Sequence, residues 1–276
     1  MKPYFLSILV AVFFFACNDH KKTDSTPAPE KTVAKKTLPK DIIYLTARPD
    51  SISFDAASTA VIVVDMQNDF GSKGGMFDKA GIDISIIQQV IEPISSVLSA
   101  ARKRGIKIIY LKMGFKQDLS DVGGLEYPTR VKRLKRMHIG DTVIAPNGTI
   151  SRILVHDNWN TDIIPKLQPQ PGDIIIYKNR FNGFYQTTLD SILRSLEKKY
   201  LIITGCTTSV CVESTVRDAA FRNYLPIVLE DCTAEPIGNG LPRTNHEASL
   251  LIIKTSFGLV STSKEFLKSI GNMPAD

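Results

Sequence analysis

The chain has 276 residues, which is enough for one large domain or two small ones. A hydrophobic content of 43% and a charged content of 22% are those of a globular enzyme. The net charge of +6 does not indicate nucleic-acid binding, because much of it lies in an N-terminal segment and in the run RVKRLKR at 130–136. That run has no interleaved aromatic residues and is typical of a solvated face.

The N-terminus predicts an exported protein. Lys2 is followed by an apolar run at 4–16, which is too short to span a membrane but fits a secretory signal. The segment FFAC at 14–17 resembles a bacterial lipoprotein signal, in which the cysteine receives the lipid. We therefore expect a signal peptide at 1–17, lipidation of Cys17, and an anchor on the periplasmic side or in the outer membrane of a bacterium. An ordinary signal peptide cut nearby is the alternative.

Two further segments follow the predicted signal. Residues 18–50 are rich in Lys, Thr, Pro and Ala and have few large apolar side chains, which predicts a flexible tether. The folded domain is predicted at 51–270, and no internal repeat is visible.

Within this domain, apolar runs alternate with segments of helical spacing. Continuous apolar runs are typical of parallel strands buried on both faces. Strands are predicted at 60–64, 106–111, 173–177, 200–204, 225–229 and 258–261, and helices at 84–104, 188–196, 209–223 and 243–254. The pattern predicts a three-layer α/β/α, Rossmann-like fold with a six-stranded, mostly parallel sheet. The irregular stretch at 115–170 is expected to shape a pocket or an oligomer contact.

Three chemically active side chains follow three predicted strands. Asp65 follows the first strand, Lys178 follows the strand at 173–177, and Cys211 lies in the turn after the strand at 200–204. The carboxyl ends of parallel strands meet at one edge of a sheet, so we expect a site there. Cys211 also precedes a helix, whose N-terminus stabilises a thiolate and is expected to lower the thiol pKa. Taken singly, each has a structural alternative: a turn cap, a surface lysine and a buried small hydrophobe.

Three segments carry a resemblance to a known family. VVDMQNDF at 63–70, YKNRFNGFYQTTLD at 177–190 and TGCTTSVCVESTVRD at 204–218 resemble the isochorismatase-like cysteine hydrolases. Within that family, GGMFDKAG at 74–81 and PQPGD at 169–173 resemble the ureidoacrylate and peroxyureidoacrylate amidohydrolases. These enzymes act in pyrimidine breakdown, which is normally cytoplasmic, so the resemblance and the predicted signal point to different compartments.

The resemblance implies a catalytic triad of Asp65, Lys178 and Cys211. It also implies an oxyanion hole made by the backbone N–H groups of Thr207 and Cys211, with a cis peptide bond between Cys206 and Thr207. The metal-binding histidines of nicotinamidases have no counterpart in YLKMGFKQD at 110–118, so we expect no metal and no cofactor. Met113 and Ser209 depart from the ureidoacrylate pattern, and they leave the exact substrate open.

Aromatic side chains near these segments are candidates for substrate binding. They are Phe70, Trp159, Phe184 and Tyr185. Cys206 and Cys232 are interpreted as buried structural thiols, and a disulfide between them is left open.

The predicted function is hydrolysis of a C–N bond of a small amide or ureido compound through an acyl-thioester on Cys211. One alternative is a vinyl-ether hydrolase of the isochorismatase type, and another is a non-catalytic ligand-binding lipoprotein on the same fold. The expected partners are a small-molecule substrate, the membrane through the lipid anchor, and a second copy of the chain; no nucleic acid is expected.

Overall fold

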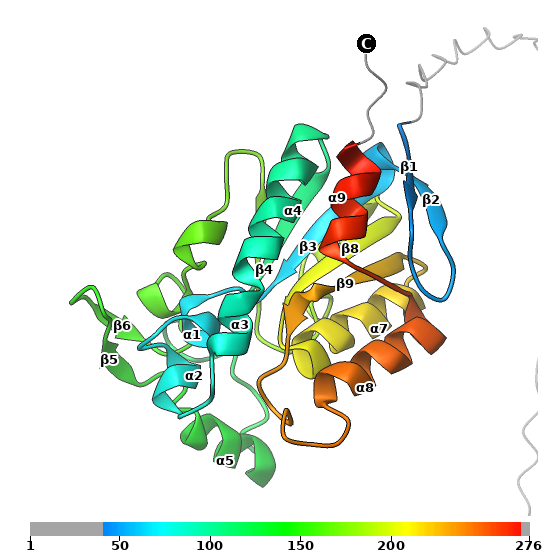
Figure 1. The fold of residues 1–276 in the computed structure, drawn as a ribbon. Helices are drawn as coiled ribbons and strands as arrows, with labels where there is room; N and C mark the ends of the chain where they lie inside the picture. Colours follow the sequence, from blue (N-terminus) through cyan, green and yellow to red (C-terminus); the bar gives the residue numbers. More distant parts are fainter. Residues whose placement is uncertain (1–40, 272–276) are drawn as a thin grey trace, which may run out of the picture. The chain divides into compact units, whose positions relative to one another are not determined.

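A parallel sheet of six strands organises the part of the chain that the structure, a computed structural model, describes, residues 41–271. Its strand order is β10-β9-β8-β3-β4-β7, and every neighbouring pair is parallel. The strands are β3 (Thr59–Val64), β4 (Lys107–Met113), β7 (Ile174–Lys178), β8 (Tyr200–Cys206), β9 (Leu225–Ala234) and β10 (Leu259–Ser261). The predicted fold class is therefore confirmed (Figure 1).

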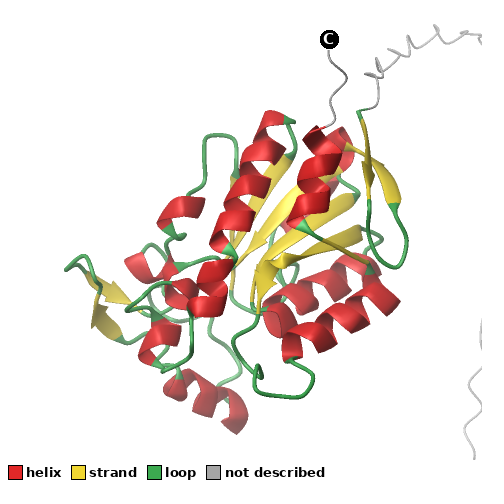
Figure 2. Ribbon diagram, in the orientation of Figure 1, coloured by secondary structure: helices red, strands yellow, loops and turns green. Residues whose placement is uncertain are grey.

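Helices cover both faces of this sheet, as Figure 2 shows. Side chains alternate along β3, so that Val61 and Val63 pack under one set of helices and Ile62 under the other. The first face is covered by α3 (Ser85–Gln89), α4 (Ile91–Lys103) and α9 (Ser263–Gly271). The second is covered by α6 (Leu189–Ser195), α7 (Glu213–Phe221) and α8 (Asn245–Ile252). The apolar strand runs are explained by these two cores, one on each face.

A hairpin of two short strands precedes the sheet. Strands β1 (Ile42–Leu45) and β2 (Ile52–Asp55) pair antiparallel, and Ile43 and Leu45 are buried in the core on the α4 face. Part of the segment predicted as a flexible tether is therefore an ordered strand. The side chains of Ile43 and Leu45 are buried by tertiary packing. The average composition of residues 18–50 is polar and does not reveal these two positions.

The irregular stretch between β4 and β7 holds several short elements. They are α5 (Pro128–Arg136), the antiparallel pair β5 (Thr142–Ile144) and β6 (Ile150–Arg152), and the 3-10 turns η2 (Trp159–Thr161) and η3 (Pro165–Leu167). The short helices α1 (Asn68–Gly71) and α2 (Met76–Lys79) follow β3 and pack against each other.

Three consecutive polar residues after β3 fix this stretch to the sheet. The Gln67 amide donates to the Met113 and Thr161 carbonyls at 2.9 and 3.2 Å, and the Asn68 amide donates to the Trp159 carbonyl at 2.8 Å. The Asp69 carboxylate accepts from the Leu154 and Met76 amides, at 2.7 and 3.0 Å, and from the Asn160 side chain. The motif VVDMQNDF at 63–70 therefore also anchors the irregular stretch to the sheet.

Asp69 gives the fold a dependence on pH. Burial raises the pKa of Asp69 from 3.8 to about 7, although its three hydrogen-bond donors lower it. A carboxyl whose pKa is raised on folding binds more protons in the native state, so the free energy of unfolding falls as pH rises from about 4 to 7. A pKa that rises from 3.8 to about 7 on folding corresponds to a loss of unfolding free energy on the order of 4 kcal/mol over this pH range.

We expect the variant Asp69→Asn, which cannot ionise, to flatten this pH dependence. It should also be less stable than the wild type at pH 5, because its amide N–H₂ meets a backbone N–H donor. Urea unfolding at pH 5 and pH 7.5 measures both effects, with Asp50→Asn at an exposed position as the control. If the unfolding free energy changed equally between the two pH values in the wild type and in Asp69→Asn, the pH dependence would belong to other groups.

Candidate functional site

A buried ion pair lies at the carboxyl edge of the sheet. Lys178 Nζ and Asp65 Oδ2 are 2.7 Å apart, and both side chains are fully buried. Lys178 Nζ also donates to the Arg180 carbonyl at 3.3 Å. The strand order explains why Asp65 and Lys178 lie together. Only β4 lies between β3 and β7, and Lys178 at the end of β7 pairs in register with Met113 at the end of β4. The chain turns directly after β3, where Asp65 takes a φ of 53°, a left-handed conformation that aspartate tolerates.

Cys211 reaches the same edge from the other side of β3. It lies in η4 (Thr208–Val212), a π-helical turn that continues into α7. Strand β8 approaches β3 so closely that a Cβ on Gly205 would lie 2.0 Å from the Val64 carbonyl oxygen, and the φ of Gly205 is +114°. Only glycine fits both conditions. The peptide bond between Cys206 and Thr207 is cis, as the resemblance implied.

Polar contacts fix the turn that carries Cys211. The buried Glu235 accepts hydrogen bonds from the backbone N–H and the hydroxyl of Ser209, at 2.9 and 2.5 Å. Thr208 Oγ1 lies 2.9 Å from His246 Nδ1. Glu235, which directly follows β9, and His246 of α8 therefore hold the turn, and sequence reasoning did not identify this support.

The electrostatics of the three side chains are coupled. Burial raises the pKa of Asp65, while the charge of Lys178 opposes the rise. Burial lowers the pKa of Lys178, but the charge of Asp65, and that of Cys211 when it is a thiolate, outweigh burial, so the net shift is upward and the ammonium form is favoured. Burial and the charge of Asp65 raise the pKa of Cys211, and Lys178 compensates only in part. The expectation of a lowered thiol pKa was therefore wrong, because burial and the charge of Asp65 together exceed the opposing effect of Lys178.

A small apolar cavity opens beside the Cys211 side chain. Its volume is about 270 Å³. Phe70, Met76, Phe77 and Ile82 come from the segments around α1 and α2. The remaining wall is formed by Met113, Arg133, Arg136, Met137, Ile139, Leu154, Phe181, Thr207, Val210, Cys211 and Ile237. The irregular stretch, including α5, therefore supplies part of this wall.

The four predicted substrate-binding aromatics lie in different places. Phe70 lies on the cavity wall, with its ring edge-to-face to Phe77 at 5.1 Å. Trp159 and Tyr185 are not among the residues that line the cavity, and the Tyr185 ring lies 5.9 Å from the Arg180 guanidinium.

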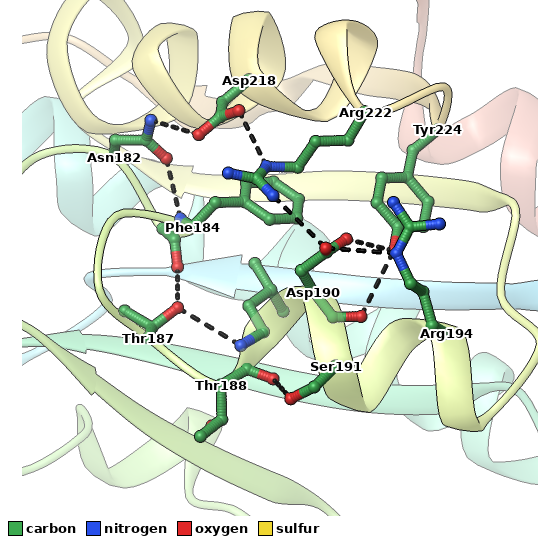
Figure 3. Close-up of polar contacts among 12 residues, drawn as sticks. Asn182, Phe184, Thr187, Thr188, Asp190, Ser191, Arg194, Asp218, Arg222 and Tyr224 are labelled. Carbon is green, nitrogen blue, oxygen red and sulfur yellow. Dashed lines mark hydrogen bonds and ion pairs between the residues drawn. The ribbon is translucent and has the colours of Figure 1, made fainter. Parts of the chain in front are cut away.

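Phe184 belongs to a packed network on the α6 and α7 face of the sheet. Its ring stacks on Tyr224 at 5.8 Å and lies beneath the Arg222 guanidinium. Figure 3 shows how ion pairs and hydrogen bonds among Asn182, Asp190, Arg194, Asp218, Arg222 and Tyr224 surround it. These contacts fix the loop that follows Lys178, so Phe184 serves packing rather than the cavity wall.

The other two described cysteines are free, buried thiols. Cys206 donates to the Asp65 carbonyl oxygen at 3.2 Å, and Cys232 packs in the core on the α4 face. The structure contains no disulfide between them.

Curated relatives match most of the chain. The ureidoacrylate amidohydrolase RutB of Pantoea ananatis is 41% identical over 229 residues, covering 82% of this chain and 88% of that protein. The enzyme of the same name from Serratia proteamaculans is 39% identical over 242 residues, covering 86% of this chain and 94% of that protein. The resemblance to ureidoacrylate amidohydrolases is thereby confirmed.

These relatives overturn the prediction of export. They carry the name of enzymes that the resemblance places in pyrimidine breakdown, which is normally cytoplasmic, so the predicted periplasmic or outer-membrane location is wrong. The signal peptide, the lipidation of Cys17 and the anchor were predicted from residues that lie outside the described part of the chain. Within residues 41–271, no helix has the length and apolar character needed to cross a membrane.

A solved structure and a family model complete the comparison. A cysteine hydrolase from Pseudomonas syringae pv. phaseolicola aligns with a TM-score of 0.65 and 28% identity, covering 85% of this chain and 99% of that one. The model of the isochorismatase domain matches residues 59–265. This range includes all six strands of the central sheet and ends within α9. The chain belongs to the isochorismatase family.

Proposed function

We propose that the chain hydrolyses a C–N bond of a small amide or ureido compound, with Cys211 as the nucleophile. The coarser activity follows from its relatives: the chain is a hydrolase that acts on C–N bonds. The cysteine mechanism is supported by one observation above the others. The only thiol on the cavity wall, among the described residues, is coupled to a buried carboxylate–ammonium pair.

The raised pKa of the thiol defines what Asp65 must do. A neutral thiol is a weak nucleophile, so a base has to remove its proton as the bond to the substrate forms. Asp65 is a carboxylate beside that thiol, and its own raised pKa makes it a stronger base than an ordinary aspartate. Lys178 stabilises the negative charge that moves from Asp65 to sulfur and back.

The reaction then proceeds in two stages. Cys211 Sγ bonds to the carbonyl carbon while its proton passes to Asp65, which gives a tetrahedral oxyanion. Collapse breaks the C–N bond, the proton on Asp65 passes to the leaving nitrogen, and an acyl- or carbamoyl-thioester remains on Cys211. Water cleaves this thioester, with Asp65 accepting a proton and returning it to sulfur.

The backbone of the turn is suited to the oxyanion. Thr207 and Cys211 both line the cavity, and the turn between them is held by Glu235. We assign the oxyanion to their two N–H groups. Removal of one such donor typically costs about 10²–10³ in rate.

The alternatives have less support. A vinyl-ether hydrolase does not need a thiol nucleophile, and a ligand-binding protein does not need a buried base. Neither one accounts for the coupling of Cys211 with Asp65 and Lys178, and the named relatives favour neither.

We expect a panel of ureido acids and primary amides to contain a compound from which the protein releases ammonia. The rate should fall at acidic pH, as Asp65 becomes protonated at a pH above its ordinary pKa of 3.8. Coupled-enzyme detection of ammonia across the panel and a pH series measures both effects. Release of pyruvate from isochorismate, together with no ammonia from any member of the panel, would instead support vinyl-ether hydrolysis.

A further inference from the structure

The cavity has an unbalanced positive charge. Among the residues that line it, two are arginines, Arg133 and Arg136, and none is acidic. The other lining side chains are apolar apart from Thr207 and Cys211. A wall of this kind favours an anionic occupant over a neutral one, because a guanidinium in apolar surroundings lacks the water that would solvate it.

Arg133 differs from neighbouring arginines in its contacts. The Arg130 guanidinium donates to the Gly123 and Val122 carbonyls, and the Arg180 guanidinium donates to the Asp121 and Asn179 carbonyls. Within residues 41–271, the half-buried Arg133 guanidinium makes no hydrogen bond or ion pair. It instead lies over the Phe181 ring at 4.3 Å.

Arg133 and the proposed nucleophile Cys211 line the same cavity. Burial lowers the pKa of Arg133, while a negative charge on Cys211 would raise it, so the guanidinium and the thiol act on each other across the cavity. The Phe181 ring supports one face of the guanidinium, which leaves its N–H edge available for a planar anion. A carboxylate matches that edge with two parallel hydrogen bonds.

We infer that Arg133 binds a carboxylate of the substrate, so that the protein selects small ureido or amide acids over neutral ureas and amides. The inference rests on the proposed function, because the carbonyl must lie at Cys211 while the carboxylate lies at Arg133. The cavity volume of about 270 Å³ suits a molecule of a few carbon atoms between these two groups.

The test compares an acid with its neutral counterpart. 3-Ureidopropanoate and its methyl ester carry the same ureido group and differ in charge, and ester cleavage releases no ammonia. For ammonia release, the wild type should show a kcat/KM at least about 10²-fold higher for the acid. Arg133→Met should lose about 10²-fold for the acid, chiefly through KM, and change less than about threefold for the ester. Arg133→Lys should retain part of the preference.

Lys132→Met is the matched control, because Lys132 is an exposed cation on the same helix and does not line the cavity. Calorimetric binding of both compounds to Cys211→Ala gives a second readout without turnover, and it should show the same preference. Equal handling of acid and ester by the wild type, or equal loss of both in Arg133→Met, would overturn the role of Arg133 and leave the hydrolase intact. Equal ammonia release by the wild type and Cys211→Ala would instead overturn the proposed function.

Discussion

Replacement of Cys211 by alanine is expected to lower turnover by about 10⁴-fold or more while leaving the fold in place. Removal of a nucleophile that works with a base typically has an effect of this size or larger. The side chain is buried on the wall of a cavity, and its loss removes one sulfur atom with its contacts to Asp65 and Lys178 but leaves the Ser209–Glu235 hydrogen bonds that hold the turn. Ammonia release measures the loss, and mass spectrometry of the quenched wild type should detect the thioester adduct.

Two further variants make the result specific. Cys232→Ala removes another buried thiol, which packs in the core away from the cavity, and it should keep near wild-type turnover. Cys211→Ser retains a hydroxyl, which is far harder to deprotonate, and it should be nearly as inactive as Cys211→Ala. Substantial ammonia release by Cys211→Ser would contradict the thioester intermediate.

The sheet and the convergence of the three side chains could be predicted from the sequence because both follow from local patterns. A strand buried on both faces must be apolar throughout, as β3 is, and parallel strands place their ends at one edge. That rule brings Asp65 and Lys178 together although 113 residues separate them. Their catalytic roles remain a proposal that the variants above and below test.

What the sequence could not predict depends on the environment of each group. The pKa of Cys211 depends on how deeply the thiol is buried, and the local motif shows only the helix that follows it. Arg133 belongs to a basic run that is typical of a solvated face, and α5 has no fully buried residue. Its position over Phe181 joins two segments that lie far apart in the chain, and the basic run alone does not encode that contact.

Separating the Asp65–Lys178 pair is expected to affect stability and activity together. In Lys178→Met the carboxylate of Asp65 loses its counter-charge while it stays fully buried. Breaking such a pair typically costs about 3–5 kcal/mol of unfolding free energy. Turnover should fall steeply as well, because nothing else among the described residues forms an ion pair with Asp65.

The double variant Asp65→Asn/Lys178→Met separates these two effects. It buries no charge at this position, so it should recover most of the lost stability, since neutral replacements of a buried pair are often tolerated. It should remain inactive, because it has no base for the thiol. Urea unfolding and ammonia release on the two single variants and the double variant measure the coupling. Additive stability losses would show that the pair contributes no mutual stabilisation.

The dependence of Lys178→Met on pH gives an independent check. Without the ammonium, burial acts unopposed by that charge and raises the pKa of Asp65 further. A carboxyl with a raised native pKa destabilises the fold above its unfolded pKa, and the penalty disappears as pH falls below that value. Lys178→Met should therefore approach wild-type stability near pH 4, whereas a variant that loses packing alone would stay destabilised at every pH. That difference would establish that the buried ammonium holds the base in its ionised form, which is the state the proposed reaction requires.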